Sequence, residues 1–228
     1  MRTLSCFILV VLATTSARAA QTNSSAALVD YELRAADKPI IQRGFLPESS
    51  PRSIAVGLPG GLSYCFDAEF CLLRYAWSGG FLDMKPTWRE RGASPPKLRG
   101  AKFFVAPATI SFRVGDLNAA PKTKFLGYEI VEKRPVFRFS VNGVVVKERI
   151  EAAPGGGLRC EFELDEAKDE ILFHSPKGVS VSAAGRELAG NDAGWVKIPR
   201  GSPTRFQVSI PGPDKAAANT TKETTKEK

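Results

Sequence analysis

The feature that most constrains the fold is a succession of short segments rich in Val, Ile, Phe and Tyr, each bounded by Gly, Pro, Asn or Asp. Segments of this kind are typical of β-strands. They lie at residues 53–58, 62–67, 70–77, 102–106, 109–114, 125–132, 136–141, 144–150, 158–164, 170–174, 179–183, 195–198 and 204–210. No window longer than one turn has helical periodicity. The sequence therefore predicts an all-β chain.

The alternation within these segments predicts how the strands pack. Residues 158–164 place Leu, Cys, Phe and Leu on one face, and Arg and Glu on the other. Asn142-Gly143 separates two such segments and predicts a two-residue hairpin, because both residue types tolerate the positive φ of a type I′ turn. Strands with one apolar face bury it against a second layer. We expect an antiparallel two-layer β-sandwich, built as a single domain over residues 29–210.

The two ends of the chain differ from this pattern. Residues 1–19 have a positive charge, an apolar run and a small-residue Ala-Arg-Ala end, which is the order of a secretory signal peptide. Residues 20–28 read as a flexible leader, and residues 211–228 as a disordered tail that lacks large apolar side chains. No later segment is apolar enough to span a membrane. We expect an exported protein, periplasmic or extracellular.

Charge and histidine content narrow the function. Loss of Arg2 and Arg18 with the signal peptide lowers the net charge from +8 to +6, which is a mild excess. The nearest feature to a basic stripe is the five cations of residues 85–99, which we interpret as a solvated basic loop, so we expect no nucleic-acid partner. The single histidine, His174, excludes sites that need several His ligands. Nucleophile-elbow, phosphate-loop and zinc-protease motifs are absent from the sequence. We expect no metal, no cofactor and, on balance, no catalysis.

The cysteines suggest one cross-link. If residues 67–69 form a three-residue hairpin loop, Cys65 stands opposite Cys71, at a distance that suits a disulfide in an oxidising compartment. The alternatives are two buried free thiols, or a metal pair that lacks its other ligands. Cys160 alternates with apolar residues, and we expect it to be a buried core thiol.

Residues 76–99 look least like scaffold. Two Trp, three Gly, three Pro and five cations fall in this segment, with little strand pattern. Loops carried on a rigid sheet often hold binding residues. Trp77 and Trp88 could stack on a sugar, and Asp83, Arg89 and Arg91 could supply hydrogen bonds beside them. The alternative is a structural crossover whose Trp side chains close the ends of the sandwich.

Residues 53–68, residues 71–83 and the Trp-Arg-Glu-Arg-Gly run at 88–92 carry a resemblance. Over roughly residues 41–149, the chain resembles a domain of unassigned activity found in exported bacterial proteins. Similar modules there accompany c-type cytochrome domains and quinoprotein sugar-dehydrogenase-like propellers. This chain departs from that pattern, because it has no Cys-x-x-Cys-His haem signature and is too short to hold a propeller. The resemblance therefore implies an isolated accessory module.

Three functional hypotheses follow. The first is an exported, non-catalytic binding module that recognises carbohydrate, or docks on a secreted redox partner, through residues 76–99. The second is a carbohydrate-active enzyme that uses carboxylates near this segment, with Asp83 and Glu90 as the acid and base. The third is electron transfer, which the missing haem signature disfavours.

Overall fold

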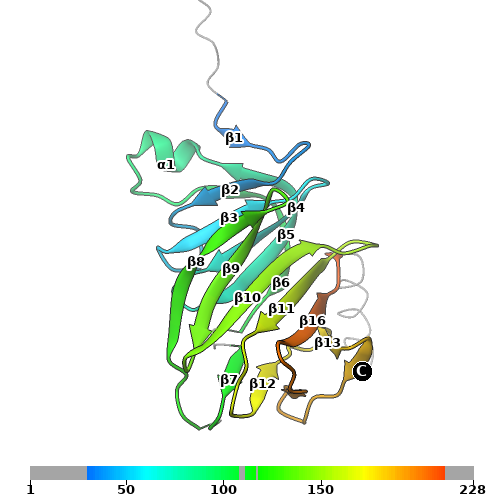
Figure 1. Cartoon of the computed structure of the whole chain (residues 1–228). Coiled ribbons are helices and arrows are strands. Elements are labelled where there is room, and N and C mark those ends of the chain that lie inside the picture. Colours follow the sequence, from blue (N-terminus) through cyan, green and yellow to red (C-terminus); the bar gives the residue numbers. More distant parts are fainter. Residues whose placement is uncertain (1–29, 108–110, 117, 214–228) are drawn as a thin grey trace, which may run out of the picture. The chain divides into compact units, whose positions relative to one another are not determined.

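Antiparallel strands build nearly all of the described chain. The computed structural model describes residues 30–107, 111–116 and 118–213, which form sixteen β-strands and one short helix, α1 (Lys85–Arg89). Every strand pair recorded among these residues is antiparallel, which confirms the predicted all-β class (Figure 1). The predicted signal peptide, the leader and most of the predicted tail lie outside the described residues.

The first sheet holds the first six strands of the chain. Its members, in spatial order, are β1 (Glu32–Leu33), β5 (Leu72–Asp83), β4 (Leu62–Asp67), β3 (Ser53–Gly57) and β2 (Ile40–Arg43), with β6 (Lys97–Val105) also paired to β5. The short strands β1 and β2 were not predicted, because each offers too few residues to establish an alternating pattern.

The second large sheet holds seven strands from the later part of the chain. Its spatial order is β14 (Arg186–Leu188), β13 (Ser180–Ala183), β16 (Thr204–Ile210), β11 (Leu158–Leu164), β10 (Val144–Ala152), β9 (Arg134–Val141) and β8 (Thr123–Val131). A third, small sheet has the order β15 (Trp195–Ile198), β12 (Ile171–His174) and β7 (Phe112–Val114). The predicted strand at 109–114 extends into residues 109–110, which lie outside the described part.

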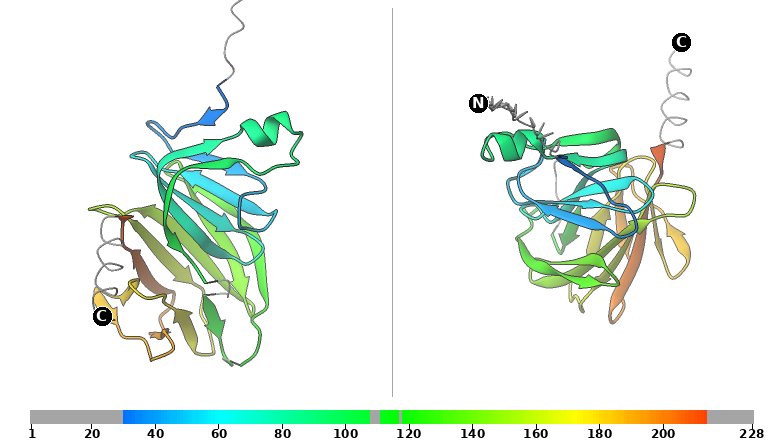
Figure 2. Two further views of the ribbon diagram at one scale, coloured as in Figure 1. Left: turned by 180° about the vertical axis from the view of Figure 1, so that it is seen from behind. Right: turned by 90° about the horizontal axis from the view of Figure 1, so that it is seen from above.

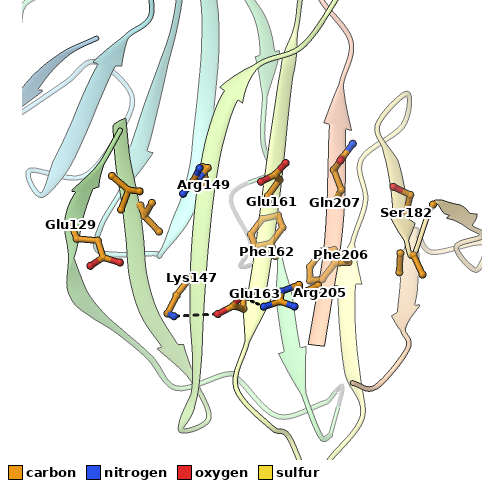
Figure 3. A pocket seen from close by; sticks show the side chains of 15 residues that line it. Glu129, Lys147, Arg149, Glu161, Phe162, Glu163, Ser182, Arg205, Phe206 and Gln207 are labelled. Carbon is orange, nitrogen blue, oxygen red and sulfur yellow. Dashed lines mark hydrogen bonds and ion pairs between the residues drawn. The ribbon is translucent and has the colours of Figure 1, made fainter. Parts of the chain in front are cut away.

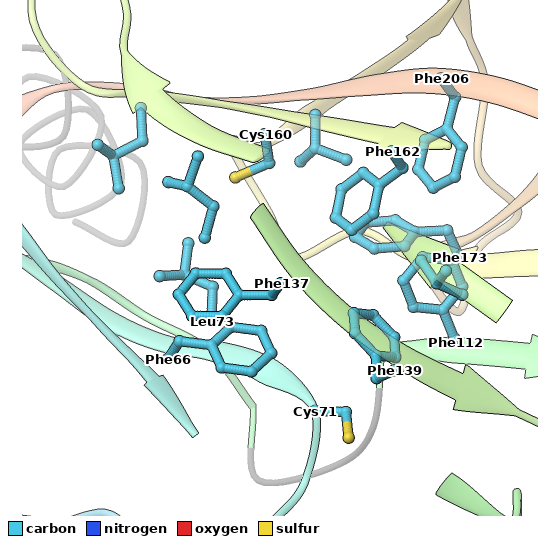
Figure 4. Close-up of a cluster of buried hydrophobic side chains, with 14 of the residues drawn as sticks. Phe66, Cys71, Leu73, Phe112, Phe137, Phe139, Cys160, Phe162, Phe173 and Phe206 are labelled. Atoms are coloured by element: carbon cyan, nitrogen blue, oxygen red, sulfur yellow. The ribbon is translucent and has the colours of Figure 1, made fainter. Parts of the chain in front are cut away.

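A shared apolar core joins the two large sheets, which lie face to face (Figures 1 and 2). Phe66 of β4 stacks on Phe137 of β9, with ring centroids 4.0 Å apart. The small sheet joins the same core through Phe112, whose ring meets those of Phe162 and Phe206 edge-on (Figure 4). The inward side chains of both large sheets thus fill one interior, as a two-layer sandwich requires.

Two-residue turns set the register of the seven-stranded sheet. Asn142 and Gly143 have φ values of 49° and 88°, and Val141 pairs with Val144, so the predicted hairpin is confirmed. Glu132-Lys133 makes an equivalent turn between β8 and β9, with φ values of 50° and 66°. Glu and Lys are not typical at these positions, so no turn signal stood out in that sequence.

A second apolar cluster lies on the opposite face of the six-stranded sheet. Its buried members are Leu46, Ala55, Cys65, Tyr75, Trp77, Phe81, Leu82 and Met84. The segment that precedes β3 covers this face, because Leu46 is buried there and the Tyr75 hydroxyl donates a hydrogen bond to the carbonyl of Pro47 (2.8 Å). This sheet is therefore buried on both faces.

Candidate functional site

Residues 76–99 are not the irregular loop that their composition predicted. Strand β5 continues to Asp83, helix α1 follows directly, and β6 already begins at Lys97. The Gly and Pro residues of this segment are typical of a loop, so its strands and its helix were not predicted. Pro86 stands in the first turn of the helix, where its missing N–H costs nothing.

The glycines allow two strands to approach closely where β5 bends. Gly79 of β5 pairs with Gly100 of β6, at an irregularity in the register. A Cβ atom on Gly100 would lie 2.0 Å from the carbonyl oxygen of Ser78, a distance that no side chain tolerates. Glycine here serves strand pairing rather than loop flexibility.

Trp77 belongs to the core and not to a binding surface. It has no exposed area, its ring is stacked near parallel to Phe81 at 6.0 Å, and its indole N–H donates to the carbonyl of Gly80 (3.1 Å). The prediction that Trp77 stacks on a sugar is wrong for this fold. Its role is structural, as in the alternative given above.

Asp83 fixes the start of the helix. Its carboxylate accepts a hydrogen bond from the backbone N–H of Lys85 (2.9 Å) and pairs with the guanidinium of Arg99 (3.0 Å). Glu90 lies past the other end of the helix, exposed, and accepts a hydrogen bond from the hydroxyl of Ser94. These contacts give Asp83 a structural role. They do not favour Asp83 and Glu90 as a catalytic pair.

The remaining predicted residues are exposed on the helix and just beyond its end. Trp88 is 50% exposed and its ring lies 6.2 Å from that of Tyr31, while Arg89 lies 5.9 Å from the Tyr31 ring centroid. Arg91 is exposed, at a positive φ of 53°, just beyond the helix. We call Tyr31, Trp88, Arg89 and Arg91 the helix patch. Of the five predicted binding residues, three share this surface.

The predicted disulfide between Cys65 and Cys71 is not formed. Asp67 pairs with Leu72, so the turn holds four residues, and Cys65 lies opposite Tyr75 rather than Cys71. Cys65 belongs to the outer apolar cluster and Cys71 to the shared core, so their side chains lie on opposite faces of the sheet. Cys160 is buried, as expected, and all three are free thiols.

The Asp67 carboxylate explains the longer turn. It is buried and accepts hydrogen bonds from the backbone N–H and hydroxyl of Ser50 (2.9 and 2.6 Å) and from the N–H of Glu69 (3.0 Å). These bonds hold residues 68–71 in a turn that a count of residue spacing could not anticipate.

An open groove crosses the outward face of the seven-stranded sheet (Figure 3). Its volume is about 780 Å³. Side chains from β8, β10, β11, β16 and β13 contribute its polar groups. We call this surface the polar groove, and its polar side chains are Glu129, Lys147, Arg149, Glu161, Glu163, Ser182, Arg205 and Gln207.

Strand register arranges these side chains in rows across the sheet. One row runs from Lys147 through Glu163 to Arg205, since these residues are direct cross-strand partners. Lys147 and Arg205 both donate to the Glu163 carboxylate, at 3.1 and 2.8 Å. These hydrogen bonds, with that of Arg205 the larger influence, lower the pKa of Glu163. This row is tied together by its own ion pairs.

The next row is much less occupied. It runs through Arg149, Glu161, Gln207 and Ser182, which are successive cross-strand partners. Arg149 has only long contacts to carboxylates, at 3.6 and 3.9 Å. Glu161 forms one ion pair, with Arg159 (3.2 Å), and the Gln207 amide donates one hydrogen bond to the Ser209 hydroxyl (3.3 Å). Ser182 makes no side-chain hydrogen bond within the described part of the chain. We call this row the middle row. Its side chains keep hydrogen-bond donors and acceptors that point into the groove and are available to a ligand.

A third row of charged side chains lies next to the middle row, on the side away from Lys147. The Glu151 carboxylate binds Arg134 (2.6 Å) and Arg159 (3.0 Å). Partial burial raises the pKa of Glu151, but the hydrogen bonds and charges of the two arginines outweigh burial, so the net shift is downward.

The polar groove was not predicted from the sequence, although the outward Arg and Glu positions of 158–164 were recognised. Only the pairing of six strands, from β13 to β8, brings these positions together.

Neither a metal centre nor a membrane helix is present in the described residues. Nowhere in residues 30–107, 111–116 and 118–213 do three His, Cys, Asp or Glu side chains gather as a ligand set. The helix in this part of the chain is too short and polar to cross a bilayer. His174 contacts the Trp195 ring edge-on at 5.1 Å, at the end of β12.

Comparison with known proteins gives one match. The model of a family described as a domain of unknown function, DUF6797, matches residues 64–148. This segment extends from β4 into β10 and includes the helix patch, apart from Tyr31. No curated protein and no solved structure matches the chain.

Proposed function

We propose that this chain is an exported, non-catalytic module that binds a neutral, hydroxyl-rich ligand, with carbohydrate as the ligand class, in the polar groove. The observation that carries the proposal is the middle row, where Arg149, Glu161 and Gln207 use only part of their hydrogen-bonding capacity on protein partners. A sugar carries many hydroxyl groups, each of which both donates and accepts, so it matches this mixed array.

The charge balance of the groove favours a neutral ligand. Its lining contains three cations and three carboxylates, so their formal charges cancel. A site for nucleic acid or another polyanion needs a clustered excess of cations. The side chains also project from paired strands, which hold them in fixed positions and reduce the entropy lost on binding.

A glycan array with the purified chain, followed by titration calorimetry on any hit, tests this proposal. We expect Arg149→Gln and Glu161→Gln each to weaken binding by about tenfold or more, which corresponds to about 1.4 kcal/mol. Arg91→Gln and Glu166→Gln make the same chemical changes at exposed positions outside the groove lining, and should bind as the unmodified chain does. The absence of any glycan ligand, or equal losses in the control variants, would contradict the proposal.

A second candidate is docking on a partner protein through the helix patch, including the secreted redox partner that the sequence resemblance implies. The exposed Trp88 favours this function, because aromatic residues and Arg are enriched in protein interfaces. A shallow depression of about 550 Å³ next to the helix adds Pro47, Pro86, Pro95 and Pro96 to the apolar surface. Trp88→Ala separates the candidates, since it should abolish docking and leave glycan binding intact.

A further inference from the structure

Glu148 is an inward-facing carboxyl in the middle of an apolar core. It lies on β10 between Val146 and Ile150, both fully buried, and is itself only 2% exposed. Its cross-strand partners are Phe137 and Phe162. No side chain or backbone group in the described part of the chain donates a hydrogen bond to it or forms an ion pair with it. Burying a carboxyl without a hydrogen-bond partner costs free energy, so such a group in a core is expected to have a specific role.

The Glu148 side chain borders a cavity of about 40 Å³ between the sheets. Aliphatic and aromatic residues, with the thiols of Cys71 and Cys160, line most of the rest; several of these side chains are drawn in Figure 4. We call this cavity with its rim the core crevice. Its rim is formed by four half-buried residues: Phe104, Ser111, Pro176 and Val179.

A water molecule alone is a poor match to the core crevice. The volume is enough for one water, which occupies roughly 30 Å³ in the liquid. A buried water, however, typically needs two to four polar partners. Besides Glu148, the described lining offers two thiols, which are weak hydrogen-bonding groups, and the Ser111 hydroxyl at the rim. The cavity fits a hydroxyl-sized group that is attached to an apolar body.

A second buried polar group without a hydrogen-bond partner lies in the shared core. The hydroxyl of Tyr64 is buried and has no hydrogen-bond partner. Burial raises the pKa of Tyr64, and the charge of Glu148 raises it further, so the two groups are within electrostatic reach without being bonded. Glu148 and Tyr64 are thus two buried polar groups without a hydrogen-bond partner in the described core, and Glu148 borders the cavity.

We propose that the core crevice is a ligand site for a neutral, mainly apolar molecule that carries one hydroxyl group, with the hydroxyl bound to the Glu148 carboxyl and the apolar body directed toward the rim. Desolvation raises the pKa of Glu148 to about 8, so near neutral pH the group is mostly the uncharged acid. An uncharged acid both donates and accepts a hydrogen bond, as a hydroxyl does. An ammonium or carboxylate ligand would lose the hydration of its charge when it enters an apolar lining, so it should bind more weakly than an alcohol.

Three probes with the same butyl chain test this site: butan-1-ol, butan-1-amine and pentanoate. We would titrate each into ¹⁵N-labelled protein at pH 6.5 and follow the amide signals of Cys160, Phe162 and Phe173. We expect butan-1-ol to shift these signals and to bind at least about tenfold more tightly than the two charged probes. Equal affinities for all three, or no shift at millimolar alcohol, would overturn the proposal.

Variants then assign the binding to the carboxyl. Glu148→Leu should weaken butan-1-ol binding by about tenfold or more, while Glu148→Gln, which still donates and accepts, should retain it within a few-fold. The matched control Glu166→Gln changes an exposed carboxylate and should have no effect. Dispersed amide spectra establish that each variant is folded. Unchanged alcohol affinity in Glu148→Leu would show nonspecific apolar partitioning and refute the assignment.

Discussion

The outward faces of the two large sheets differ sharply. On the six-stranded sheet, outward side chains such as Tyr75 and Trp77 are buried under the segment that contains Leu46. On the seven-stranded sheet, the corresponding positions carry ion pairs and border the open polar groove. Both sheets bury an apolar inner face. The difference teaches that a strand's second face becomes a core or a binding surface according to whether another segment of chain covers it.

The strongest test of this contrast uses the two tryptophans. We expect Trp77→Ala to lower the free energy of unfolding by about 3–5 kcal/mol, because it leaves a large cavity in a fully buried cluster. Trp88→Ala, at a half-exposed ring, should change it by no more than about 0.5 kcal/mol. Urea unfolding followed by circular dichroism measures both. Similar losses in the two variants would remove the distinction between a covered cluster and an exposed patch.

A second test compares the interior with the charged face along one strand, β10. Burial raises the pKa of Glu148 from 4.5 to about 8, so the folded state binds a proton that the unfolded state has released. Stability should therefore fall as pH rises from about 4.5 to 8. Tyr64, Cys71 and Cys160, the titratable groups that Glu148 influences, have pKa values raised by burial and so stay uncharged over this range.

Glu148→Leu should remove this penalty. We expect it to be more stable than the unmodified chain by about 2–4 kcal/mol near pH 8, with the difference shrinking toward pH 4.5, below which only the pH-independent cost of burying the neutral acid remains. Unfolding free energies measured between pH 4 and 9 provide the comparison. A constant difference across this range would mean that the carboxyl does not titrate with folding.

A smaller effect than at Trp77 or Glu148 is expected on the charged face. Glu151→Gln removes the negative charge and one of the two acceptor oxygens that bind Arg134 and Arg159. These groups are partly solvated, so the loss should be about 0.5–1 kcal/mol at pH 7. Because the pKa of Glu151 is lowered in the folded state, its contribution is present above about pH 4.5 and is lost as pH falls below that value. Chemical unfolding at pH 7 and pH 3 checks this. A loss of several kcal/mol would show that the ion pairs hold the fold together.

Strand pattern predicted most of the seven-stranded sheet but little of what lies over and between the sheets. Residues 158–164 alternate cleanly, and their faces were assigned correctly because β-strands alternate by geometry. Trp77 lies in a strand too, but it is buried by a cluster that combines the nearby Phe81 with Leu46, more than twenty positions away. Helix α1 has only five residues, too few to show a helical period.

The site residues illustrate the same limit. Arg149, Glu161 and Gln207 come from three strands and meet only through the register of the folded sheet. The Cys65–Cys71 prediction was wrong by one residue of loop length, which moved Cys71 into the turn. Glu148 stands at an inward position of its strand, and a polar residue on an otherwise apolar face is a signal that could have identified it.

The two-residue turn at Asn142-Gly143 determines which changes this molecule can accept. Side chains alternate with a period of two, so one residue inserted in this turn would exchange the inward and outward faces of one strand relative to its neighbour. Lys147 and Arg149 would then face the aromatic core, and Val146 would face water. Substitutions at outward positions can therefore give the groove new ligand preferences while the core stays intact, whereas changes in hairpin length cannot.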